Sequence, residues 1–298
     1  MIMKLFPVVR LLLLALPVIG QTSRPGLTEE NVVYGEASGE KLTMDYYKPT
    51  GPGPHPIVII IHGGGFVAGT SKNISEAYCA DFLAPAGYAV FSINYRLAPK
   101  YPYPAMVEDV LTAVRFLRSH AAKWDADPQR IALLGGSAGG YLSNMAGLRG
   151  VATDAPVQAV VTLYGVSDFS GRPVNEHGHA LLDPLIKEKG EEAALREASP
   201  ITHVTAKAPP FLLIHGDNDQ AVPFDQSTRL QVALRKAGAS CELIRVVHGA
   251  HATGRWHTLP GVVDWEREMA GWLNKTLHHE GPIGAGIRER KPVANSQD

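Results

Sequence analysis

The sequence predicts an α/β fold in which a central, mostly parallel β-sheet is flanked by helices on both faces. Short runs of consecutive apolar residues alternate with helical patterns along the chain, and such alternation is typical of parallel sheets covered by helices. The chain has 298 residues, of which 45% are hydrophobic and 19% charged, which suits one α/β domain with an ample core. Ligands in such sheets bind beyond the carboxyl ends of the strands.

The N-terminal residues 1–20 have the pattern of a signal peptide. Lys4 and Arg10 precede an apolar run over residues 11–20, which is too short to span a membrane. We expect cleavage near Gly20, a catalytic domain over residues 21–279, and a protein that is secreted or periplasmic without stable membrane insertion. An uncleaved anchor is the alternative.

Two segments could cover a site at the carboxyl ends of the strands. The first, residues 21–47, contains strand-like pieces at 31–35 and 42–47, which we expect to extend the sheet at its edge. The second, residues 171–198, favours a helix only over 188–198. Together they predict a minimal lid.

A buried strand over residues 56–61 ends in the sequence His62-Gly63-Gly64-Gly65-Phe66. Glycines free the backbone so that N–H groups can converge on one point, as stabilisation of a negatively charged oxygen requires. Gly64 and Gly65 are therefore the candidate donors of an oxyanion hole, whereas His62 is expected to be structural. The alternative is a flexible glycine loop without such a role.

The next strand and helix are predicted over residues 89–95 and 107–120. The apolar run at 130–134 then leads directly into the G-x-S-x-G sequence of residues 135–139. A serine on a strained strand-to-helix turn is exposed for nucleophilic attack, so Ser137 is the candidate nucleophile and the N–H group of Ala138 a further oxyanion donor. A purely structural glycine turn is the alternative.

Candidate acids follow two later strands. The strand at 157–164 precedes Asp168, for which a turn or cap role is expected although it is a rival acid. The strand at 210–215 precedes Asp217 and Asp219. We assign Asp219 to orienting the histidine and stabilising its imidazolium, and Asp217 to the turn.

The candidate base follows the last predicted strand, residues 241–247. Two histidines occur there, His248 and His251. A general base must reach Ser137 from an exposed position, and His251 on the glycine-containing loop suits this better. His248 is expected to be a strand-end residue with a satisfied ring.

The C-terminal part comprises an amphipathic helix at 265–277 and a loose tail at 280–298. Cys79 and Cys241 are the only cysteines and are expected to be two buried thiols. The formal net charge is −1 at pH 7, and the absence of a basic patch argues against a nucleic-acid partner.

This ordered set of motifs resembles the α/β-hydrolase superfamily, in its hormone-sensitive-lipase-like and acetylxylan/feruloyl-esterase-like branch of small carboxylesterases, over residues 30–275. The resemblance also uses residues 94–99, 103–105, 199–201 and 222–223. In this family the second aspartate of H-G-D-x-D is the triad acid and the histidine of the final loop is the base, which supports Asp219 and His251. The final loop, His-Gly-Ala-His-Ala-Thr, departs from the more usual Gly-x-x-His-Gly-Phe.

The resemblance implies a secreted serine carboxylesterase that hydrolyses short-chain acyl esters through an acyl-enzyme, with acetyl or feruloyl groups on plant polysaccharide as candidate substrates. The partner would be a small-molecule or polysaccharide-linked ester, no metal or organic cofactor is required, and the oligomeric state stays open. The alternatives are an amidase or formamidase, a peptidase-like hydrolase with the same triad, and a non-catalytic binding protein on this fold.

Overall fold

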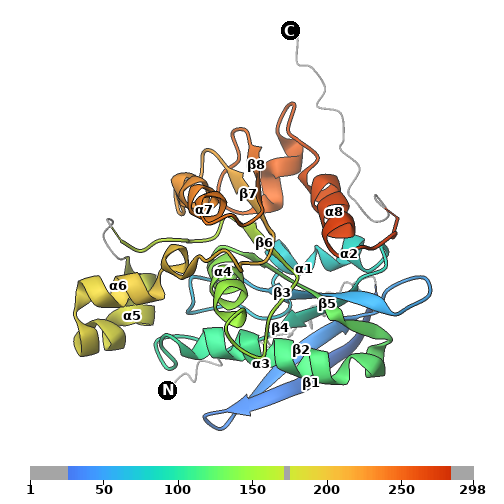
Figure 1. The fold of residues 1–298 in the computed structure, drawn as a ribbon, viewed down its shortest axis with the longest axis horizontal. Coiled ribbons are helices and arrows are strands. Elements are labelled where there is room, and N and C mark those ends of the chain that lie inside the picture. Colours follow the sequence, from blue (N-terminus) through green and yellow to red (C-terminus); the bar gives the residue numbers. More distant parts are fainter. Residues whose placement is uncertain (1–25, 171–174, 283–298) are drawn as a thin grey trace, which may run out of the picture.

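The computed structural model describes residues 26–170 and 175–282, and these residues form an eight-stranded sheet. Its strand order is β1-β2-β4-β3-β5-β6-β7-β8, with the β1–β2 and β2–β4 pairs antiparallel and the other neighbours parallel (Figure 1). The predicted fold class is thereby confirmed. The strands are β1 Leu27–Ala37, β2 Glu40–Tyr47, β3 His55–Ile61, β4 Ala89–Ile93, β5 Ala126–Gly136, β6 Ala159–Leu163, β7 Phe211–Gly216 and β8 Cys241–Val246.

Helices cover both faces of the sheet because its central strands are apolar on both sides. In β3, Ile57, Ile59 and Ile61 join one hydrophobic cluster with α3 to α7, and Val58 and Ile60 join another with α2 and α8. The α-helices are α1 Ile74–Ala77, α2 Ala80–Leu83, α3 Ala105–His120, α4 Ala138–Gly150, α5 Glu176–Lys189, α6 Glu191–Ala198, α7 Asp225–Lys236 and α8 Trp265–Thr276. Short 3₁₀ helices are η1 Ala121–Trp124, η2 Pro200–His203 and η3 Thr253–Thr258.

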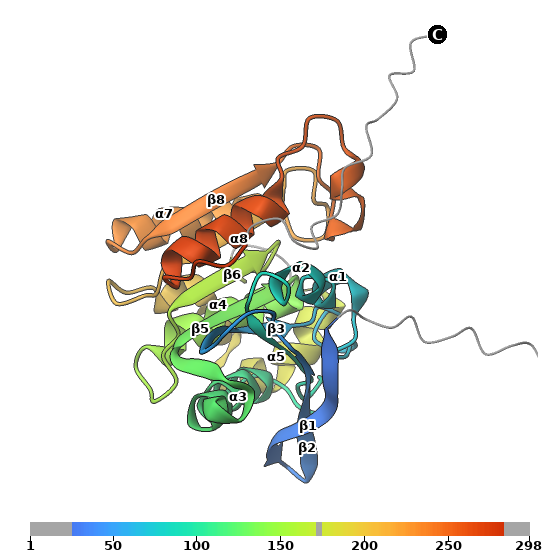
Figure 2. The same cartoon turned by 90° about the vertical axis from the view of Figure 1, so that its right-hand side faces the viewer.

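The two strand-like pieces near the N-terminus form an edge hairpin, as expected. Strands β1 and β2 pair antiparallel, and β2 then pairs with β4. Figure 2 shows the hairpin extending from one edge of the sheet. Both strands are longer than the sequence predicted.

The segment after β6 contains more helix than the sequence predicted. Helix α6 lies within the expected range, but α5 precedes it, and the pair projects to one side of the molecule (Figure 1). Asn175 caps α5 by accepting a 2.9 Å hydrogen bond from the Gly178 N–H group. The prediction missed α5 because Pro184 lies inside it, and proline normally ends a helix.

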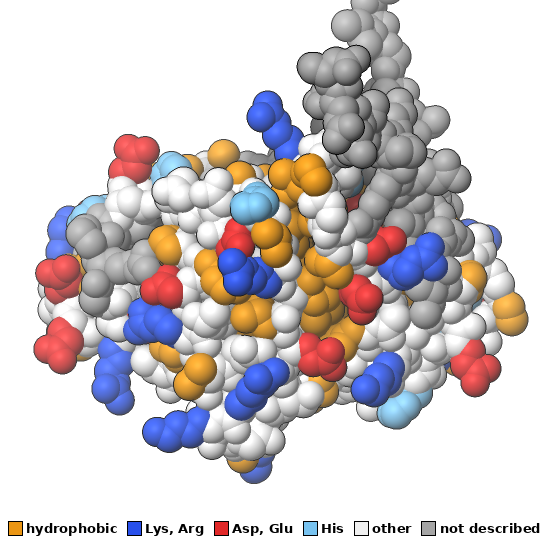
Figure 3. Space-filling view, turned by 90° about the horizontal axis from the view of Figure 1, so that it is seen from above, with side chains coloured by type: hydrophobic (Ala, Val, Ile, Leu, Met, Phe, Trp, Pro, Cys, Tyr) orange, Lys and Arg blue, Asp and Glu red, His pale blue; other side chains and the backbone are white. Residues whose placement is uncertain are grey.

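Cys79 and Cys241 are buried free thiols, as expected. The predicted signal peptide at 1–20 and most of the predicted tail lie outside the described residues. Within residues 26–170 and 175–282, no helix combines the length and hydrophobicity needed to cross a membrane. On the face that carries α7, β8 and α8, acidic and basic side chains are interspersed around a central group of hydrophobic ones (Figure 3).

Candidate active site

The loops at the carboxyl ends of the parallel strands surround a cavity of about 860 Å³. This volume lies within the range of small-molecule sites. The predicted site residues on its wall are Gly64, Gly65, Ser137, Ala138 and His251. The structure thus brings together motifs that follow β3, β5 and β8, with Asp219 after β7 in hydrogen-bond contact behind His251.

Ser137 stands on a strained turn between β5 and α4. Its φ of 55° lies in the left-handed region, which costs a residue with a side chain of order 1–3 kcal/mol. Its backbone N–H group donates to the Leu163 carbonyl at 2.9 Å, which fixes the turn to the end of β6. The turn needs glycine at position 139, because a Cβ there would collide with the Ile61 carbonyl of β3. The serine hydroxyl is therefore held at the cavity wall by the packing of three strands.

A continuous hydrogen-bond chain joins the serine to a buried carboxylate. His251 Nε2 lies 3.0 Å from Ser137 Oγ, and His251 Nδ1 lies 2.7 Å from Asp219 Oδ2. The ring of Tyr164 packs edge-on against the imidazole at 4.8 Å between centroids. The Trp256 indole holds the loop by donating to the Ala250 carbonyl at 2.8 Å. Both nitrogens of His251 are thus directed at partners.

Asp219 is held in its ionised form. Burial raises its pKa, but hydrogen bonds from His215, His251 and the Val222 N–H group outweigh burial and keep the pKa well below its ordinary value. The N–H groups of Ala221 and Val222 both donate to Oδ1 at 2.9 Å, which leaves Oδ2 for His251.

The glycine loop after β3 adopts a conformation suited to glycine alone. Gly64 has a φ of 117° and Gly65 a φ of 59°, and a Cβ on Gly64 would collide with the Ala68 carbonyl. His62 is buried, stacks on Tyr95 at 4.2 Å and has its pKa lowered to about 4 by burial. A buried, neutral histidine fits the structural role predicted for it.

Asp217 and His248, the rivals in the final loops, lie together away from the serine. Asp217 accepts from Arg245 Nε and from the His248 N–H group, each at 2.7 Å. Asp217 therefore joins the loop after β7 to β8 and to the loop that follows β8, rather than closing a local turn. The His248 side chain is exposed two residues after the end of β8, where solvent can satisfy its ring.

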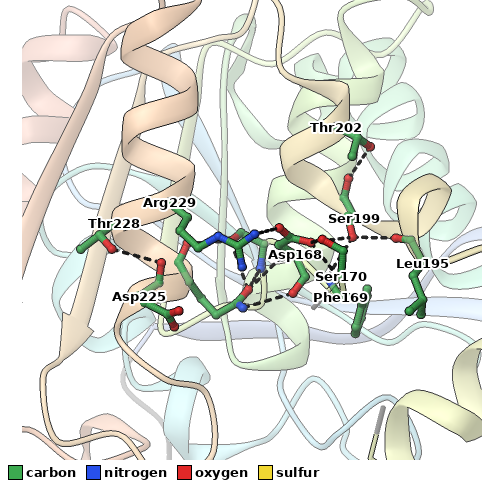
Figure 4. Close-up of polar contacts among 11 residues, drawn as sticks. Asp168, Phe169, Ser170, Leu195, Ser199, Thr202, Asp225, Thr228 and Arg229 are labelled. Carbon is green, nitrogen blue, oxygen red and sulfur yellow. Dashed lines mark hydrogen bonds and ion pairs between the residues drawn. The ribbon is translucent and has the colours of Figure 1, made fainter. Parts of the chain in front are cut away.

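Asp168, the rival acid after β6, is occupied by other partners (Figure 4). Its carboxylate accepts from the Ser170 N–H group at 2.7 Å and forms an ion pair with Arg229 of α7. The Ser170 contact is the predicted turn role, and the ion pair is an addition that sequence reasoning missed. Asp168 also lines the cavity, where it borders Phe169.

Several cavity residues carry no signal in the sequence. The most unusual is Glu76 of α1, a carboxyl that is 1% exposed on the cavity wall. Its position 61 residues before Ser137 and outside every motif gave no reason to select it. Other cavity residues that sequence reasoning did not select are Tyr164, Val166, His177 and Gln220. Across the described part of the chain, no group of three or more His, Cys, Asp or Glu side chains is placed to hold a metal ion.

Comparison with solved structures places this fold among esterases. The truncated form of a carbohydrate esterase from gut microbiota superposes with a TM-score of 0.73 at 28% identity, covering 86% of this chain and 99% of that one. An acetyl ester-xyloside bifunctional hydrolase from Caldicellulosiruptor lactoaceticus gives 0.71 at 25% identity, covering 86% and 98%. The chain has the α/β-hydrolase fold.

Sequence relatives agree with this placement. Esterase LipC of Mycobacterium tuberculosis is 33% identical over 237 residues, which is 73% of this chain and 59% of LipC. The chain spans about half to three fifths of the length of such curated relatives. The BD-FAE family model matches residues 44–234, so the chain belongs to the BD-FAE family.

Proposed function

We propose that this protein is a serine carboxylesterase in which Ser137, His251 and Asp219 form the catalytic triad. The observation that carries the proposal is the hydrogen-bond chain from Ser137 Oγ through His251 to Asp219, with distances of 3.0 and 2.7 Å. A serine, a base and an orienting acid in this geometry are the requirements for nucleophilic acyl transfer.

The reaction has two acyl-transfer steps. His251 takes the Ser137 proton as the oxygen attacks the ester carbonyl, and then gives it to the departing alcohol. Water repeats the cycle on the acyl-enzyme. Gly64, Gly65 and Ala138 line the same cavity. Their N–H groups are the proposed donors to the oxyanion, a contribution of about 3–4 kcal/mol for one such donor.

The proposed substrates are short-chain acyl esters, including acetyl or feruloyl groups on plant polysaccharide. The cavity of about 860 Å³ can hold more than an acetyl group, and its wall combines aromatic and amide side chains such as Phe169 and Asn175. The C. lactoaceticus neighbour is described as an acetyl ester-xyloside hydrolase, which supports this class. We also propose that the protein is exported, on the basis of the N-terminal pattern of residues 1–20.

The test is acid release from acetylated xylan and methyl ferulate, beside p-nitrophenyl acetate and butyrate, with Ser137→Ala as the blank. Activity on xylan or ferulate that is absent from the blank supports the polysaccharide assignment. Turnover confined to the p-nitrophenyl esters restricts the protein to small esters. Equal rates for the wild type and Ser137→Ala contradict the triad.

A further inference from the structure

Glu76 is a buried carboxyl on the cavity wall that the proposed mechanism does not use. The side chain extends from α1, which follows the oxyanion loop in the sequence. The Ser75 hydroxyl donates to Glu76 Oε2 at 2.7 Å. Ionising a carboxyl that is only 1% exposed costs free energy. A buried Glu76 beside the nucleophile is therefore a candidate for a functional role.

The carboxyl fills the space beneath the nucleophile turn. A Cβ on Gly136, which precedes Ser137, would lie only 2.6 Å from Glu76 Oε1. A Cβ on Gly63, which precedes the oxyanion glycines, would lie 3.2 Å from the same oxygen and 3.4 Å from Ser137 Cβ. Glu76 thus touches both halves of the proposed machinery, the oxyanion loop and the turn of the serine.

His251 is the cationic group that acts on this carboxyl among the residues described around it. Burial raises the pKa of Glu76 to about 7, while hydrogen bonds from Ser75 and the Gly63 backbone and the charge of His251 act to lower it. The other titratable groups that interact with Glu76 are Tyr164, Tyr95 and Cys79. Burial raises the pKa of all three, so they are neutral near pH 7.

We propose that Glu76 is a positioning residue of the esterase: its ionised carboxylate holds the oxyanion loop at Gly63 against the serine turn and stabilises the imidazolium of His251. The inference rests on the proposed function. During attack the proton moves from Ser137 Oγ to His251 Nε2 and later to the leaving alcohol. At a pH above its pKa of about 7, Glu76 keeps its charge during these proton transfers and acts through the field that it exerts on His251.

The test compares wild type, Glu76→Gln and Glu76→Asp on p-nitrophenyl acetate from pH 5 to 9. In Glu76→Gln we expect kcat at pH 8 to fall about tenfold with KM little changed, because the imidazolium loses a nearby negative charge. The acid limb of the kcat/KM profile should move to lower pH, because the neutral imidazole is no longer disfavoured. Glu76→Asp keeps the charge and should keep the position of the limb.

Thermal unfolding separates this role from a merely structural one. A carboxyl whose pKa is raised on folding contributes stability below its unfolded pKa and loses that contribution as pH rises through about 7. The Tm of Glu76→Gln relative to wild type should therefore rise between pH 5 and pH 8, although the variant is slower. Glu266→Gln is the matched control, because Glu266 is 6% exposed on α8 and does not line the cavity.

Two outcomes overturn the inference in distinguishable ways. A Glu76→Gln protein with wild-type kcat and a superimposable pH profile contradicts the role of Glu76 and leaves the triad intact. A wild-type protein without ester turnover contradicts the proposed function and this inference together.

Discussion

At the scale of single residues, two carboxyl groups near Ser137 have opposite environments. Asp219 accepts two backbone N–H groups and His251, which hold its pKa well below the ordinary value. For Glu76, burial is the largest influence on the pKa and raises it to about 7. When the environments of two nearby carboxyls shift their pKa values in opposite directions, the two groups take different tasks. Asp219 is the constant anion of the proposed triad, and Glu76 is the carboxyl whose charge changes near neutral pH.

Asp219→Asn should lower kcat about 10⁴-fold with little effect on folding. The amide oxygen can still accept from the Ala221 and Val222 N–H groups, but its NH₂ group faces His251 Nδ1 and favours the tautomer that cannot take the serine proton. The measurement is kcat on p-nitrophenyl acetate, together with the Tm. Asp183→Asn on α5, a half-exposed carboxyl, is the control. A loss below about tenfold would exclude Asp219 as the triad acid.

At the scale of elements, the loop after β8 is held in place by contacts from β7. His248 has a φ of 61°, and its N–H group donates to Asp217, which also binds Arg245 of β8. Because His251 lies three residues further along, the position of the base depends on this junction. Asp217 is thus a support for the base and not a second acid.

Asp217→Ala should lower kcat by about tenfold and the free energy of unfolding by about 1 kcal/mol, through the loss of the His248 hydrogen bond. The control is Glu242→Ala, which removes an exposed carboxyl from β8. Urea unfolding and kcat on p-nitrophenyl acetate are measured in parallel. A normal kcat in a destabilised Asp217→Ala protein would show that the base is positioned without this junction.

Local patterns predicted the elements of the sheet but not the whole cover of the cavity. Buried strands such as 56–61 are continuous apolar runs, so their identity is encoded locally. Helix α5 contains Pro184, which local propensity disfavours, yet Leu181 and Leu182 are fully buried in the core. Tertiary packing therefore stabilises this helix despite its proline, so a short window of sequence does not predict it.

At the scale of the whole molecule, the parallel sheet assembles the site from distant segments. Ser137, Asp219 and His251 could be predicted because each follows a recognisable strand, and parallel strands end at one edge of the sheet. Glu76 could not be predicted, because it lies in a four-residue helix whose burial depends on contacts with β3 and β5. The sequence thus identifies site residues that directly follow a strand. Site residues on other elements, such as Glu76, can be identified only from the structure.

Both thiols should be unreactive in the folded protein. Burial raises the pKa of Cys241 to about 12 and that of Cys79 well above its ordinary value, so neither forms the nucleophilic thiolate at pH 8. We expect no reaction with Ellman's reagent until guanidinium chloride unfolds the chain, and then two thiols per molecule. Rapid modification of the native protein would contradict this packing of the core.

The central claim is that Ser137 is an activated nucleophile, and covalent labelling with a fluorophosphonate tests it most directly. Intact-mass and peptide analysis should show one label per chain, located on Ser137, and none on Ser137→Ala. His251→Ala should label far more slowly, because the base that activates the serine is gone. Absence of labelling in the folded wild type, or a label on another residue, would contradict the account.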